Sequence, residues 1–115
     1  MSQITTTVMK REEARFDMVG TFLGYPLSVM NEVITQGLAE RLTKYALNHL
    51  DDEGFLDAVN GWKVEVYTLD GDAKPADRTY CVRFINKKGG SIEVIGIFTK
   101  NGWPFLNHGL AIQRA

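Results

Sequence analysis

Few side chains in this sequence could do chemistry, and they form no catalytic motif. Cys81 and His108 are the residue types of a thiol nucleophile and its base. The strand pattern described below places them on opposite faces of a sheet, so we predict no catalytic residue. The segment Asp70–Asp72 begins like a calcium loop, but Lys74 stands where an oxygen ligand is needed. We therefore predict no metal site and no cofactor.

Charge is unevenly distributed along the 115 residues, whose net charge is −1. Residues 1–60 carry five Lys/Arg and nine Asp/Glu, whereas residues 61–115 carry eight and five. Basic and aromatic side chains together are typical of nucleic-acid sites. Those expected near strand ends are Lys87, Lys88, Lys100, Arg114, Trp62 and Trp103. Because the basic excess is small for such a site, nucleic-acid binding is only a second alternative.

The composition is that of an ordinary globular domain, with 44% hydrophobic and 23% charged residues. The length suits one domain, which we expect to span residues 1–115. A lone cysteine cannot form an internal disulfide, and the N-terminus lacks the basic and apolar regions of a signal peptide. We therefore expect a cytoplasmic protein that does not interact with membranes.

The first half of the chain shows helical spacing. Apolar residues recur every three or four positions between Met30 and His49, which predicts an amphipathic helix over about 28–50. Pro26 or Ser28 would begin it. The acidic segment Asp51–Glu53 would cap a short second helix over about 52–59.

From Trp62 onward the hydrophobic period is two, which predicts strands over about 62–69, 79–86, 91–99 and 104–113. Lys87–Gly90 would form one connecting turn. Asn101–Gly102 would form another, of the type I′ hairpin class. The expected fold class is α+β, with both helices on one face of a four-stranded antiparallel meander.

Alternation along the strands assigns side chains to faces, provided that no β-bulge intervenes. His108 then points toward the helices, either as a hydrogen-bonded core histidine or as the lining of a cavity. Such a cavity would suit a small-molecule-binding protein or an acid–base enzyme, and it is the first alternative function. Its predicted residues are His108, Tyr45, Tyr80, Trp62 and Gly96.

The opposite face carries an apolar patch with charged neighbours, which is typical of an interface. The predicted interface residues are Tyr67, Cys81, Arg83, Ile85, Ile95 and Ile97. Either residues 1–25 fold over this face, or a second copy or another protein covers it, or it is exposed. The leading functional hypothesis is a small, non-catalytic binding or regulatory protein. It would act through this face as a homodimer or with a protein partner.

Overall fold

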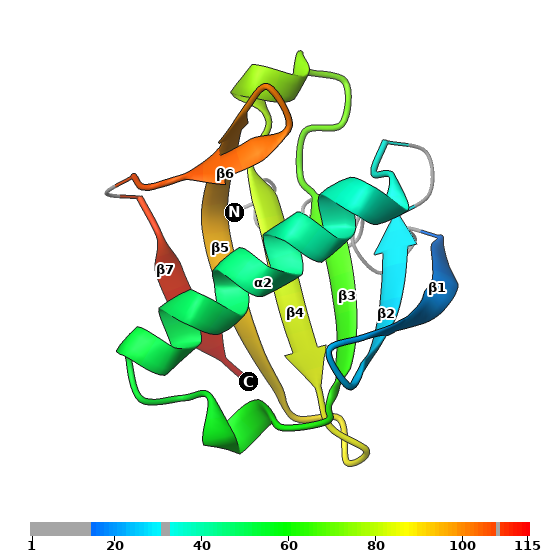
Figure 1. Cartoon of the computed structure of the whole chain (residues 1–115), viewed down its shortest axis with the longest axis vertical. Helices are drawn as coiled ribbons and strands as arrows, with labels where there is room; N and C mark the ends of the chain where they lie inside the picture. The colour runs from blue at the N-terminus through cyan, green and yellow to red at the C-terminus, as the bar shows by residue number, and fades with distance from the viewer. Residues whose placement is uncertain (1–14, 31–32, 108) are drawn as a thin grey trace, which may run out of the picture.

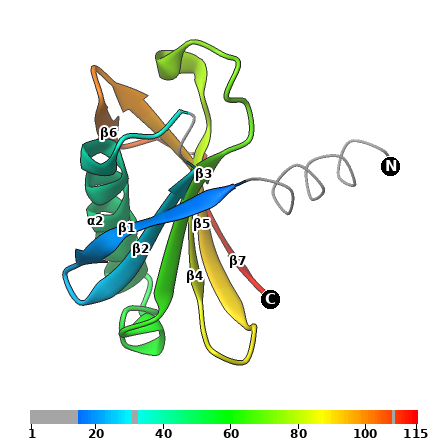
Figure 2. The ribbon, with the colours of Figure 1, turned by 90° about the vertical axis from the view of Figure 1, so that its right-hand side faces the viewer.

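A computed structural model of the chain describes residues 15–30, 33–107 and 109–115. Over these residues the fold is α+β, with one α-helix, α2 (Gln36–Asp52), packed on a seven-stranded, mostly antiparallel open sheet (Figure 1). Seen from the side, α2 covers a single face of the sheet (Figure 2). We call the opposite face the outer face. No helix in the described part is long and apolar enough to cross a membrane.

The strands lie in the order β1-β2-β3-β4-β5-β6. The remaining strand, β7, also pairs with β5, along a different part of that strand from β6. Their bounds are β1 (Phe16–Phe22), β2 (Tyr25–Met30), β3 (Lys63–Thr68), β4 (Tyr80–Ile85), β5 (Ser91–Lys100), β6 (Trp103–Phe105) and β7 (Ala111–Arg114). Among the strands of the described residues, only β2 and β3 pair in parallel. Since β2 precedes α2 and β3 follows it, α2 is the crossover that parallel pairing requires.

The prediction of a helix over 28–50 is wrong at its start. Tyr25, Leu27 and Val29 alternate into the core as part of β2. The helix begins only after Thr35, whose Oγ1 accepts a hydrogen bond from the Leu38 amide at 3.2 Å. The short helix predicted over 52–59 is also wrong in extent, because only the 3-10 turn η1 (Asp57–Val59) forms there.

The strands predicted over 62–69, 79–86 and 91–99 are confirmed as β3, β4 and β5. The type I′ turn is confirmed as well. Asn101 and Gly102 have φ angles of 55° and 80°, and Lys100 pairs with Trp103 across a two-residue loop. Three of the four predicted strands therefore lie in a larger sheet, which the β1–β2 hairpin extends.

The predicted strand over 104–113 is split into β6 and β7 because β5 contains a bulge. Cys81 pairs with Ile95, whereas Tyr80 pairs with Ile97, so Gly96 is the extra residue. The bulge reverses the alternation beyond it, and Ile97 lies in the core rather than on the outer face as predicted.

The chain crosses close to Gly96 between β6 and β7. A Cβ atom at Gly96 would overlap the carbonyl oxygen of Gly109. The Asn107 side-chain amide donates to the Gly96 carbonyl at 3.1 Å, in place of a strand ladder. Leu106, predicted to face the core, is instead 83% exposed.

The core lies between α2 and the sheet. The buried residues of α2 recur at helical spacing, which points one side of the helix at the strands. They are Ala39, Leu42, Thr43, Ala46, Leu47 and Leu50. Val64, Val66, Val82, Phe84 and Val94 contribute fully buried side chains from the three central strands.

Candidate functional site

A row of charged side chains crosses the outer face. Strand register places Arg83 of β4 between Glu65 of β3 and Glu93 of β5. The Arg83 Nη1 atom is 3.7 Å from Glu65 Oε1, and Arg83 Nε is 3.9 Å from Glu93 Oε1. The Tyr67 hydroxyl donates a 2.7 Å hydrogen bond to Glu93 Oε2. This network compensates the charge of Glu93, which is 4% exposed.

None of the predicted interface residues is fully exposed. Tyr67 and Cys81 are buried, and the Phe16 ring meets the Tyr67 ring edge to face at 6.3 Å. Ile85 and Ile95 are half-buried. Together with the position of Ile97 in the core, this leaves only part of the expected apolar patch on the outer face.

Exposed large apolar side chains lie elsewhere among the described residues. Trp103 is 63% exposed, Phe105 43% and Leu106 83%, in or next to β6, and Met18 and Leu23 are exposed in the first hairpin. The Arg41 side chain of α2 hydrogen-bonds the Gly102 carbonyl at 2.8 Å and lies 4.8 Å from the Trp103 ring centroid. These contacts hold β6 against the helix while its apolar side chains face outward.

The pocket predicted around His108 is not assembled from its other members, and His108 itself lies outside the described residues. Trp62 precedes β3, whereas Tyr80 pairs with Thr68 at the far end of that strand. Tyr45 donates a 3.2 Å hydrogen bond to the Phe105 carbonyl, and desolvation raises the pKa of its hydroxyl. The space beside Gly96 is filled by the backbone of Gly109.

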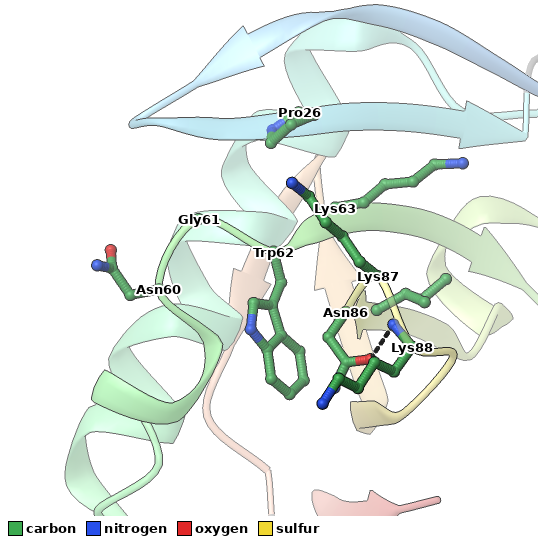
Figure 3. Close-up of a pocket in the computed structure, with 9 residues that line it drawn as sticks. Pro26, Asn60, Gly61, Trp62, Lys63, Asn86, Lys87 and Lys88 are labelled. Carbon is green, nitrogen blue, oxygen red and sulfur yellow. Dashed lines mark hydrogen bonds between the residues drawn. The ribbon is translucent and has the colours of Figure 1, made fainter.

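A cleft of about 700 Å³ lies where β3 begins and β4 ends (Figure 3). The register that pairs Lys63 with Ile85 brings these two strand ends together. We call it the Trp62 cleft, and its lining residues are Pro26, Asn60, Gly61, Trp62, Lys63, Ile85, Asn86, Lys87 and Lys88. Its volume is in the range of small-molecule sites.

The turn between β4 and β5 forms one wall of the Trp62 cleft and is braced from within. Asn86 Oδ1 accepts hydrogen bonds from the Lys88 and Gly90 amides, each at 2.9 Å. The Asn86 amide donates to the Gly90 carbonyl at 2.9 Å. These bonds fix the backbone of Lys87 and Lys88, so their ammonium groups extend from a defined position.

The opposite wall comes from the segment before β3. The Trp62 amide donates to the Val59 carbonyl at 2.9 Å, which closes the turn after η1. The Trp62 side chain is half-buried, so part of its indole packs on the core and part borders the cleft. Figure 3 shows the indole beside the side chains of the Asn86–Lys88 turn.

The described lining residues of the Trp62 cleft include three lysines and no carboxylate. Lys63 lies 3.8 Å from Glu65 Oε2, which offsets part of its charge. No carboxylate of the described residues makes an ion pair with Lys87 or Lys88. The cleft therefore has a positive wall facing an aromatic one, a combination that suits a negatively charged ligand with an apolar part.

Sequence reasoning identified some of these side chains but assigned them to other sites. Trp62 was predicted both in the His108 pocket and, with Lys87 and Lys88, in the nucleic-acid site of the second alternative. Lys100 and Trp103 of that same basic group pair with each other at the far end of β5. Arg114 lies 5.5 Å from the Phe55 ring centroid. The contribution of Pro26 was missed, since nothing in the sequence indicates that β2 adjoins β3.

A smaller cavity of about 290 Å³ lies between the end of α2 and β7, with His49, Glu53 and Arg114 among its lining residues. Its acidic and basic groups give it no uniform charge. Among the described residues, no cluster of three or more His, Cys, Asp or Glu could hold a metal ion.

Comparison with known proteins adds no further constraint. No protein-family model, curated protein or solved structure matches this chain.

Proposed function

We propose that the protein is a binding protein whose ligand is an anion held in the Trp62 cleft. The observation that carries this proposal is the lining of that cleft: three lysines without a described carboxylate, opposite an indole. Two of them, Lys87 and Lys88, project from a turn that Asn86 braces. A preorganised wall of positive charge lowers the cost of ordering the site when an anion binds.

The proposal can be tested with inorganic tripolyphosphate, which carries charge but no ring. At an ionic strength near 0.01 M, where screening is weak, titration should shift the amide resonances of Gly61, Lys87, Lys88 and Gly89. The double variant Lys87→Gln/Lys88→Gln removes two charges, each contributing about 1 kcal/mol in water at 4 Å. We therefore expect its affinity to fall by about 10- to 30-fold.

A matched control removes the same net charge elsewhere. Lys44 and Lys100 are exposed and do not line the cleft. The variant Lys44→Gln/Lys100→Gln should bind tripolyphosphate nearly as tightly as the unchanged protein. Equal losses in the two double variants would mean that the anion responds only to overall charge, and the cleft proposal would be abandoned.

The exposed side chains around β6 favour a second candidate function, which is association with a second copy or another protein. Trp103 and Phe105 are of the residue types enriched at interface centres. Sedimentation velocity over a range of concentrations should show self-association that Leu106→Ser weakens, while Ile95→Asp on the outer face does not. Loss of association in Ile95→Asp alone would instead favour the outer face. A strict monomer would contradict self-association through either surface.

A further inference from the structure

We infer that the ligand of the Trp62 cleft is a nucleobase joined to phosphate, with the base on the indole and the phosphate on the lysines. This inference rests on the proposed function, because it assigns the two ends of the same ligand to the two walls of the cleft. The shared chemistry could be supplied by a free nucleotide or by one nucleotide of a single strand.

The first argument is the arrangement of the walls. An inorganic anion would need the lysines alone, yet the half-buried Trp62 side chain is held beside them by the backbone bond to Val59. Indole rings stack on nucleobases of any identity, because every base offers a π-face. Lysine supplies the compact positive charge that phosphate groups attract. A ligand that is both flat and anionic uses both walls.

The second argument concerns the amide donor that Asn86 adds to the lining of the cleft. Asn86 Oδ1 is engaged by two backbone amides, which fixes the orientation of the side-chain amide. Its Nδ2 group makes no hydrogen bond to the described residues and can therefore donate to a ligand. Nucleobase edges carry carbonyl and ring-nitrogen acceptors that such amide donors can bind.

The third argument is size and access. A cleft of about 700 Å³ has room for one nucleotide, and it opens at the end of the sheet instead of being enclosed by it. A nucleotide within a longer strand could therefore enter with its neighbours remaining in solvent.

The experiment compares adenosine triphosphate with inorganic tripolyphosphate, which has similar charge but no base. Their affinities are measured by calorimetry at low salt for the unchanged protein, Trp62→Phe and Trp62→Leu. Base stacking on an aromatic side chain should make the nucleotide bind about 5- to 140-fold more tightly than tripolyphosphate. Trp62→Phe should keep most of that advantage, and Trp62→Leu should remove it.

Tripolyphosphate also reports whether the variants keep the site folded, since its binding should be the same in all three proteins. If the nucleotide and tripolyphosphate bind the unchanged protein equally, the nucleobase inference is overturned while the anion-binding proposal stands. If neither the nucleotide nor tripolyphosphate binds, the nucleobase inference and the anion-binding proposal both fail. A nucleotide advantage that persists in Trp62→Leu would also overturn the inference, because the base would then lie elsewhere.

A short thymidylate strand distinguishes the two sources of the ligand. If the strand binds more tightly than adenosine triphosphate, with the same dependence on Trp62, single-stranded nucleic acid is the source of the ligand. Weaker binding of the strand would identify a free nucleotide.

Discussion

Gly96→Ala tests the junction where the chain crosses β5 between β6 and β7. Gly96 has a φ of 93°, which side chains rarely adopt. An added Cβ would lie 3.2 Å from the Gly109 carbonyl carbon and nearer still to its oxygen. Backbone strain of this kind costs about 1–3 kcal/mol, and forcing a packed group aside costs about 1–3 kcal/mol more. We expect the free energy of unfolding to fall by about 2–6 kcal/mol in total.

Gly89→Ala is the matched control for this substitution. Gly89 has nearly the same φ, 89°, but no atom lies within 4 Å of its added Cβ. Only the strain of about 1–3 kcal/mol should therefore remain. A domain of this length is expected to have a free energy of unfolding of about 6–17 kcal/mol, so a loss in the middle of the range expected for Gly96→Ala leaves a folded protein to measure.

The assay is urea denaturation followed by circular dichroism, with both variants and the unchanged protein measured side by side. The difference between the two variants isolates the steric contribution of Gly109. If Gly96→Ala loses no more stability than Gly89→Ala, the close approach at the bulge is refuted. The explanation for the split between β6 and β7 would then fail with it.

Four other substitutions, the last two compared as a pair, test separate parts of the fold by the same denaturation assay. Leu23→Asn should raise the free energy of unfolding by about 1 kcal/mol, because Leu23 has a φ of 52° that asparagine tolerates better; a loss would contradict the turn. Tyr67→Phe should lower it by about 1.5–3 kcal/mol, since the hydroxyl donates to a buried carboxylate of Glu93; an unchanged value would mean that the bond contributes nothing. Ile97→Ala should lower it by about 2–5 kcal/mol and Ile95→Ala by much less, because only Ile97 lies in the core; the reverse order would contradict the bulge.

The elements that sequence reasoning placed well are those whose signals are local. A hydrophobic period of two predicted β3, β4 and β5 close to their observed bounds. The Asn101–Gly102 pair predicted its own hairpin, because both residues accept positive φ angles without help from the rest of the fold.

The first hairpin was missed because its signals are weak. Leu23 and Gly24 both have positive φ in the turn between β1 and β2, but leucine carries no preference for that conformation. Further along, Met30, Val33 and Ile34 continue the spacing of the helix that follows. The helix was therefore predicted to begin before Thr35, and the end of β2 was assigned to that helix.

Some residues of the candidate site were identified from the sequence. Trp62, Lys87 and Lys88 were noted as basic and aromatic residues near strand ends, and antiparallel pairing of β3 with β4 brings them together. Lys100 and Trp103 lie at the opposite end of β5 from the Lys87–Lys88 turn, whereas Arg114 pairs with Ile92 near the same end as that turn.

The sequence by itself determined the α+β class, the three central strands, the turns after β4 and β5, and the uneven charge. The strands follow from the alternation of side chains along a strand, and the turns follow from residues with an intrinsic preference for the backbone angles of a turn. The tertiary structure alone decided that β2 adjoins β3 in parallel, because that pairing joins segments separated by the whole of α2. It also decided that Ile97 faces the core, since one extra residue at Gly96 reverses every assignment beyond it. The Trp62 cleft depends on the first of these decisions, which places Pro26 of β2 beside the lysines and the indole.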